Sequence, residues 1–171
     1  MPITMSSASL PIFRTTLSNL SHILDKGLAH AQARKIDPQV LTSDRLAPDM
    51  LPFSRQIQIA CDAAKNGAAR LAGVEAPRFE DTETTFEELK ARITKTLAWL
   101  DTVPAAKLDG CEDKDITFPV GRESTRTMKG EAYLKHWVLP NLFFHVTTAY
   151  AILRHNGVEL GKADYLAGAR A

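Results

Sequence analysis

Apolar residues recur every three or four positions over much of this sequence, and that period constrains the fold more than any other feature. Between residues 7 and 32 the successive spacings are 3, 4, 3, 4 and 4, which places these side chains on one face of an α-helix. The stripe consists of Leu10, Phe13, Leu17, Leu20, Leu24 and Leu28. The pattern therefore predicts a long amphipathic helix over residues 7–32.

Two further stretches show the same helical period. A second helix is predicted over residues 49–72, and Gly73 directly after it is a typical helix end. A third is predicted over residues 84–102, where a threonine followed three residues later by a glutamate can form a capping box. The second stripe is Met50, Phe53, Ile57, Cys61, Ala64, Ala68 and Leu71, and the third is Phe86, Leu89, Ile93, Leu97 and Leu100.

The period changes after the third helix. Apolar residues alternate with other side chains over residues 116–120, and the Gly-Arg-Glu-Ser stretch that follows can turn, so a small β-hairpin is predicted. The last helix is predicted over residues 130–156, with a kink or interruption at Pro140. We therefore expect an all-α fold: a four-helix bundle with a small hairpin before the last helix, forming one domain over residues 1–171. An α+β domain would need more strands.

Charge and composition argue against two classes of partner. The chain has 21 basic and 20 acidic residues, whereas proteins that bind nucleic acid usually show a basic excess. No apolar run reaches the roughly 18 residues that a membrane span needs. The N-terminal stretch lacks the pattern of a signal peptide, and the two cysteines form no CxxC motif. We therefore expect a cytoplasmic protein with free thiols, and neither nucleic acid nor membrane as partner.

The polar residues most able to carry chemistry border the apolar stripes. Common catalytic motifs such as HExxH, GxSxG, the P-loop and GxGxxG do not occur. On a helical wheel His145 lies about a quarter-turn from the centre of the apolar face, and Asn141 lies one turn earlier on the same side. Gln56 has a similar border position on the second helix. Gln56, Asn141 and His145 are therefore predicted to line an inter-helix pocket. A single histidine in this position is usually a hydrogen-bonded structural residue, and a metal ligand is a further alternative.

Four stretches covering nearly the whole chain carry a family resemblance. They are LAPDMLPFSRQIQIACDAAKNGAARLAGVE, FEDTETTFEELKARI, FPVGRE and, most specific of all, LPNLFFHVTTAYAILRHNGVELGKADYLAG. These stretches resemble an uncharacterised bacterial family of unknown function in the DinB/YfiT-like superfamily, which includes metalloenzymes. The resemblance implies a DinB-like four-helix bundle and, as in many relatives, a homodimer.

The same resemblance bears on a metal site. DinB-like enzymes generally hold a metal with one histidine from the second helix and an HxxxH pair on the last, and some are metal-dependent thiol transferases. The LRHNG ending of the last helix resembles the superfamily's LRxxG ending, which aligns the pair with Asn141 and His145. The remaining position falls at Gln56, or alternatively at Gln58. The resemblance thus implies a degenerate site in which two of three metal ligands are missing.

These observations favour one function and leave alternatives open. The leading hypothesis is a small-molecule binding protein without a cofactor, whose ligand is unknown. The alternative is an active transferase or hydrolase. In that case His145 would act as a general base or would hold a divalent metal together with a carboxylate such as Asp49. A third possibility is an interaction protein whose dimer face is its function.

Overall fold

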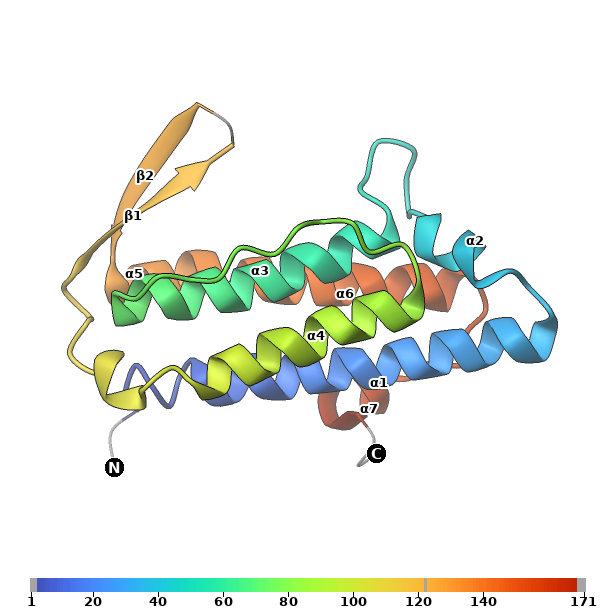
Figure 1. Ribbon diagram of the computed structural model, residues 1–171, viewed down its shortest axis with the longest axis horizontal. Coiled ribbons are helices and arrows are strands. Elements are labelled where there is room, and N and C mark those ends of the chain that lie inside the picture. Colours follow the sequence, from blue (N-terminus) through green and yellow to red (C-terminus); the bar gives the residue numbers. More distant parts are fainter. Residues whose placement is uncertain (1–2, 122, 169–171) are drawn as a thin grey trace.

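The long helices form the bundle that the periodicity predicts, as the computed structural model shows (Figure 1). The structure describes residues 3–121 and 123–168. The principal helices are α1 (Leu10–Arg34), α3 (Phe53–Ala72), α4 (Phe86–Asp101) and α6 (Leu139–His155). Helix α3 packs against both α4 and α6, and α1 packs against α4. The prediction of an all-α bundle is confirmed.

Two short helices lie outside the four-helix pattern. Helix α2 (Pro38–Ser43) follows α1, and α7 (Lys162–Ala167) follows α6 and packs on α1. A carboxylate fixes α7: Asp164 accepts hydrogen bonds from the backbone N–H of Gly161 at 2.7 Å and from Lys26 at 2.9 Å, and contacts His22 at 3.2 Å. The backbone bond and these side chains lower the pKa of Asp164 to about 2. The C-terminal helix is therefore tied to α1 by charge as well as by packing.

The second principal helix begins later than the apolar stripe suggests. It starts at Phe53 rather than near Asp49, and Pro52 is its extended N-cap residue. The reason is local, because a proline disfavours the α conformation of the residue before it, and both Pro48 and Pro52 lie in this stretch. Residues 44–52 therefore form a loop beside the start of α3. By contrast, α4 begins with the predicted capping box, made by Thr85 and Glu88.

The hairpin lies where the alternation places it. Strands β1 (Asp115–Val120) and β2 (Ser124–Lys129) pair antiparallel, with Thr117 opposite Thr127. The side chains of Ile116 and Phe118 are buried, and the rest of the hairpin extends away from the bundle beside α5 (Figure 1). Its inward face therefore covers one end of the last helix.

The interruption predicted at Pro140 takes the form of a π-helical turn. A short helix, α5 (Gly130–Tyr133), continues into this turn at Leu134–Val138 and then directly into α6. The N–H of Leu139 bonds the carbonyl of Leu134, five residues back. The wider turn directly precedes Pro140, which has no N–H to donate. It packs closely on α3, since a Cβ on Gly67 would lie 2.5 Å from Cγ1 of Val138.

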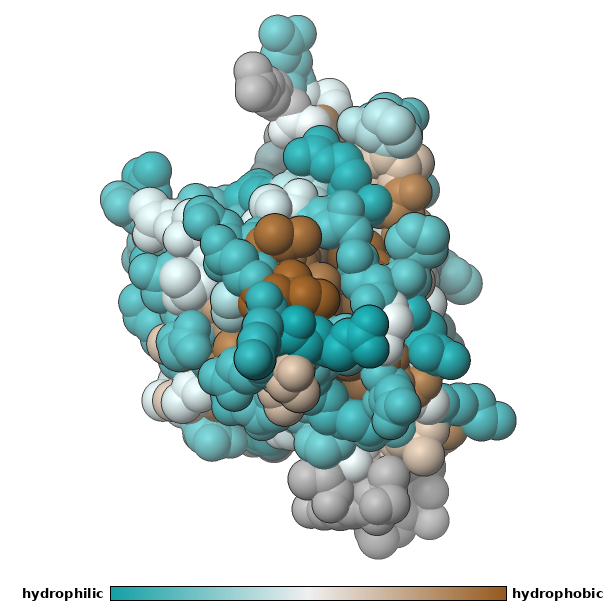
Figure 2. Space-filling model, turned by 90° about the vertical axis from the view of Figure 1, so that its right-hand side faces the viewer, coloured by the Kyte–Doolittle hydropathy of each residue, from teal (hydrophilic) through white to brown (hydrophobic). Residues whose placement is uncertain are grey.

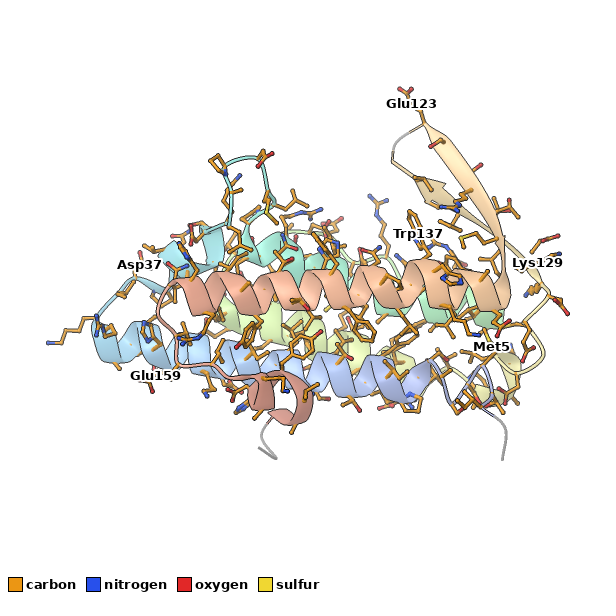
Figure 3. All side chains as sticks on the ribbon, turned by 180° about the vertical axis from the view of Figure 1, so that it is seen from behind. Met5, Asp37, Glu123, Lys129, Trp137 and Glu159 are labelled. Carbon is orange, nitrogen blue, oxygen red and sulfur yellow. The ribbon has the colours of Figure 1, made fainter. Side chains whose placement is uncertain are left out.

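Side chains from all four principal helices fill the space between them (Figure 3). The end of the molecule that carries α2 is mostly hydrophilic, with a small hydrophobic area in its middle (Figure 2). Within residues 3–121 and 123–168, no helix combines the length and the apolar character that crossing a membrane requires.

Candidate functional site

His145 of α6 and Gln56 of α3 meet between their two helices. Nδ1 of His145 lies 2.7 Å from Oε1 of Gln56, and Nε2 of Gln56 donates to the carbonyl of Leu51 at 2.9 Å. Gln56 is buried and His145 is half-buried. Leu51 belongs to the loop before α3, which leaves its carbonyl free of any helix. The structure thus brings together two of the three residues predicted to share a pocket.

This chain of bonds fixes the hydrogen positions. A backbone carbonyl only accepts, so the Gln56 amide must present its NH₂ to Leu51 and its oxygen to His145. Because that oxygen also only accepts, Nδ1 of His145 must carry a hydrogen. In the neutral ring Nε2 then has a free lone pair, and it has no hydrogen-bond partner within the described part of the chain. The site therefore offers one oriented acceptor nitrogen.

Burial keeps His145 neutral. Desolvation of the imidazolium lowers the pKa of His145 from 6.5 to about 4. The edge-to-face contact between the rings of His145 and Phe144, with centroids 5.2 Å apart, adds an apolar neighbour. At neutral pH the side chain is therefore an uncharged hydrogen-bonding group.

Asn141 does not join this pair. It lies one turn earlier on α6 and lines a separate hollow of about 220 Å³ together with Asn66 and Arg70 of α3. Its side chain makes no hydrogen bond to Gln56 or His145. All three predicted residues thus lie along the contact between α3 and α6, with Asn141 nearer the hairpin than the other two.

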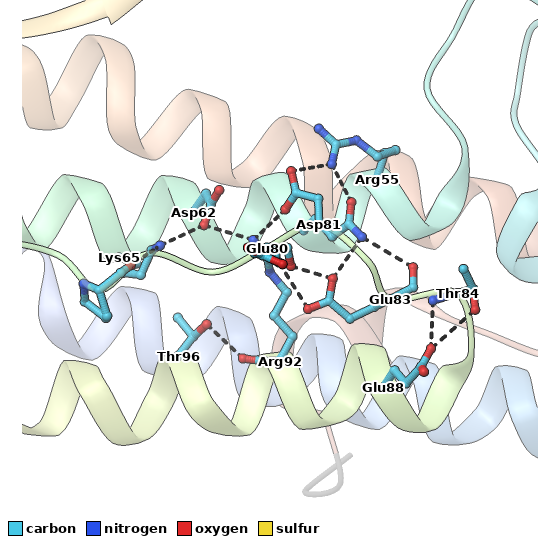
Figure 4. A network of polar contacts seen from close by, with 12 residues as sticks. Arg55, Asp62, Lys65, Glu80, Asp81, Glu83, Thr84, Glu88, Arg92 and Thr96 are labelled. Atoms are coloured by element: carbon cyan, nitrogen blue, oxygen red, sulfur yellow. Dashed lines mark hydrogen bonds and ion pairs between the residues drawn. The ribbon is translucent and has the colours of Figure 1, made fainter.

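Gln58, the other candidate position on α3, belongs to a network of charges (Figure 4). It accepts from Arg55 at 2.6 Å and donates to the carboxylate of Glu83 at 3.0 Å. At the centre lies Arg92 of α4, whose side chain is only 1% exposed. Its guanidinium contacts Asp62 at 3.1 Å and Glu83 at 3.1 Å, and also Asp81 at 2.9 Å. Gln56 rather than Gln58 is therefore the partner of His145.

The network holds the connection between α3 and α4 against both helices. Lys65 of α3 donates to the carbonyl of Pro77 at 2.8 Å and lies 4.3 Å from the ring centre of Phe79. Although burial opposes it, pairing with Arg55 and Arg92 keeps the pKa of Asp81 below its usual range. This network was not predicted from the sequence. One signal was available: the polar residues Arg55, Gln58, Asp62 and Lys65 recur with helical spacing on α3.

The side chains near His145 do not fit the metal that the superfamily resemblance implies. Within residues 3–121 and 123–168, no group of three or more His, Cys, Asp or Glu side chains is placed to hold a metal ion. Gln56 uses its oxygen for His145, and Asn141 faces another hollow. Asp49, a possible carboxylate ligand, is exposed in the loop before α3. A single free imidazole nitrogen falls short of the three or four ligands that such metals require.

A second hollow is large and apolar. It measures about 620 Å³ and lies between α1, α6 and α7. Its walls include Phe143 and Leu166, which are 38% and 60% exposed. A shallower apolar hollow continues past Phe143 to Phe144 and Leu46. Large apolar side chains thus gather on the outer face of α6.

The crystal structure of a DinB family member protein from Shewanella denitrificans is similar to this chain, with a TM-score of 0.86 and 42% sequence identity; the similarity covers 94% of this chain and 90% of that one. The fold is therefore that of a DinB-like helical bundle. Residues 5–166 match the family described as a domain of unknown function, DUF1993, and the chain belongs to this family. None of the curated proteins matches it significantly. The predicted family resemblance is confirmed.

Proposed function

We propose that this protein binds a small molecule beside the contact between α3 and α6, with His145 as its hydrogen-bond anchor. The observation that carries the proposal is the 2.7 Å bond between His145 Nδ1 and Gln56 Oε1, itself held by Leu51. This bond orients the ring and leaves Nε2 as an acceptor. The ligand would present a hydroxyl, thiol or N–H group to Nε2.

Binding is favoured over acid–base catalysis by the state of the imidazole. A general base works best when its pKa is near the working pH. Burial lowers the pKa of His145 to about 4, so the ring takes up a proton poorly at neutral pH. A neutral, oriented imidazole suits recognition of a donor group better. A hydrolase or transferase that uses His145 as base is therefore the weaker alternative.

A ligand screen tests the proposal. Binding to the folded state alone raises the melting temperature, so the protein is heated with a panel of small thiols, alcohols and amides. We expect hits whose stabilisation is lost in His145→Ala and reduced in Gln56→Leu. The exposed His155→Gln, at the end of the same helix, serves as the control and should behave like the unchanged protein. Identical responses of His145→Ala and the unchanged protein would contradict the proposal.

A metal analysis separates this proposal from its metal-dependent alternative. After extensive dialysis the protein is expected to retain no stoichiometric zinc, nickel or iron, because no group of three possible ligands surrounds His145 in the described part of the chain. Stoichiometric metal that disappears in His145→Ala would overturn the metal-free site and favour a metal-dependent transferase or hydrolase instead.

We further propose that the protein forms a homodimer. The support is the exposed apolar surface around Phe143, Phe144 and Leu166 on α6 and α7. Contiguous exposed apolar surface of this kind commonly marks an interface. A second copy of the chain offers the same face, as a twofold interface requires.

A further inference from the structure

The hollow lined by Asn141 has a chemistry of its own. It lies between α3 and the α5–π–α6 helix, and Pro119 of β1 stands at its rim. Trp137 belongs to the π-helical turn and lies on the side that faces the hairpin (Figure 3). The ring of Trp137 packs on Phe118 of the hairpin, with centroids 4.9 Å apart. Both walls of the hollow are thus held by regular structure rather than by a free loop.

Several polar side chains that line this hollow have no hydrogen-bond partner among the described residues. The side chains of Asn66, Asn141 and Trp137 line it and make no hydrogen bond to any described residue. Arg70 donates one N–H to the hydroxyl of Tyr133 at 3.0 Å. No carboxylate within residues 3–121 and 123–168 lies within 4.0 Å of its guanidinium. The remaining N–H groups of Arg70 are therefore free for a ligand.

Tyr133 adds a buried donor. Its side chain lines the hollow and is 1% exposed. Because its oxygen accepts from Arg70, its own hydrogen still needs an acceptor, and no described residue supplies one. Burial raises the pKa of Tyr133, so the hydroxyl keeps that hydrogen at neutral pH. The Tyr133 hydroxyl can therefore still donate one hydrogen bond to a ligand in the hollow.

The carboxylate that lines the hollow is not paired with Arg70. This carboxylate, Asp62, is already paired with Lys65 and with Arg92, each at 3.1 Å. Arg70 is the cation whose charge is left uncompensated. A single negative charge on the ligand would balance it, and a planar carboxylate matches the fork of a guanidinium.

We infer that this hollow is a binding site for a small monocarboxylate with an apolar or aromatic body. Arg70 and Tyr133 would hold the carboxylate, while Asn66 and Asn141 would bond its remaining lone pairs. The ring of Trp137 and the side chain of Ile59 form the apolar walls. At about 220 Å³ the space is smaller than the roughly 300–1,000 Å³ of pockets for drug-sized ligands, so the ligand is small. The inference does not depend on His145.

Benzoate is a suitable probe, with benzamide as its uncharged counterpart and inorganic phosphate as a different anion. The NMR signal of the Trp137 indole N–H reports on the hollow. The signal of Trp99, the other tryptophan of the chain, is the internal reference. We expect benzoate to shift the Trp137 signal with a dissociation constant of about 1 mM or tighter. Benzamide should bind at least about tenfold more weakly, since loss of one charge-assisted pair is worth about that factor. Phosphate should also bind more weakly than benzoate, because it has no apolar body to place against Trp137 and Ile59.

Variants test whether Arg70 supplies the charge that binds benzoate. Arg70→Gln should weaken benzoate binding about tenfold or more, whereas Arg34→Gln, which removes the same charge at an exposed position of α1, should not. His145→Ala should leave benzoate binding unchanged. Equal binding of benzoate and benzamide, preferential binding of phosphate, or no response of Trp137 would overturn the inference without relying on any variant. Loss of binding in His145→Ala but not in Arg70→Gln would overturn it and assign the ligand to the His145 pair.

Discussion

At the scale of single residues, the two nitrogens of His145 have different surroundings. Nδ1–H is held by Gln56, whose amide is held in turn by a loop carbonyl. Nε2 has no protein partner among the described residues. Protonation would place a positive charge on a half-buried ring beside the apolar ring of Phe144. Because removing that charge from water is unfavourable, burial lowers the pKa of His145. The fold therefore keeps this ring neutral and asymmetric.

The lowered pKa predicts a pH dependence of stability. In the unfolded chain His145 titrates near 6.5, but in the folded protein its pKa is about 4. Between these two values the unfolded chain binds a proton that the folded protein does not. The free energy of unfolding should therefore fall as the pH drops from 6.5 to 4, by at most about 3 kcal/mol from this residue. Urea titrations at a series of pH values measure this dependence.

Two variants isolate the contribution of His145. His145→Gln should be less sensitive to acid between pH 6.5 and 4 than the unchanged protein. His155→Gln should keep the full dependence, because His155 is exposed on the last turn of α6. An equal loss of stability with acid in His145→Gln and the unchanged protein would contradict the assignment.

At the scale of elements, the connection between α3 and α4 is held by charge rather than by regular structure. Three cations, Arg55, Lys65 and Arg92, lie among the carboxylates of Asp62, Asp81 and Glu83. The charges balance, and the buried guanidinium is also bonded to the carbonyl of Glu80 at 3.0 Å. Removing one partner of a buried ion pair is strongly destabilising, because the remaining charges stay buried without a partner.

Removal of the Arg92 side chain should therefore strongly destabilise the folded protein. Arg92→Met leaves Asp62, Asp81 and Glu83 without their shared cation, and we expect the free energy of unfolding to fall by about 3–5 kcal/mol. Amide hydrogen exchange should rise in residues 76–85 before the helices are affected. Denaturant unfolding and exchange mass spectrometry measure the two effects.

A surface ion pair between α4 and α1 provides the comparison for Arg92→Met. Lys90 of α4 pairs with Asp25 of α1, and both side chains are at least one-third exposed. Lys90→Met should cost no more than about 1 kcal/mol and leave exchange in residues 76–85 unchanged. If Arg92→Met were no more harmful than Lys90→Met, the network would not be what holds this connection.

At the scale of the whole molecule, the bundle leaves one outer face of α6 uncovered. Helix α7 packs on α1 beside it, and the loop residue Leu46 borders it on the other side. Phe143, Phe144 and Leu166 remain exposed between these neighbours. Pairing with a second copy would remove these side chains from water, which is the main driving force for association.

A charge introduced into the exposed outer face of α6 tests the proposed dimer. Phe143→Lys should shift the protein from dimer to monomer in sedimentation velocity, because a buried unpaired ammonium opposes association. Ala98→Lys places the same charge at an exposed position of α4 and should leave the dimer intact. A monomeric unchanged protein, or a dimer that survives Phe143→Lys, would contradict the proposal.

Some elements could be predicted accurately from the sequence and others could not, for physical reasons. The helices were predictable because each buries one stripe, and the stripe repeats along the chain. The start of α3 was misplaced because Pro48 and Pro52 interrupt an apolar pattern that includes Met50. The π-helical turn was expected only as an irregularity at Pro140, since its form depends on packing against Gly67.

The sequence by itself determined the bundle, the hairpin and the family, since these depend on local period, turn residues and motifs. It also indicated that Gln56 and His145 border facing stripes. Only the tertiary structure decided that these two side chains bond, that Asn141 instead shares a hollow with Arg70, and that Arg92 is buried among carboxylates. Those pairings join residues distant in the chain, and they depend on the rotation and offset of packed helices, which a stripe alone does not specify.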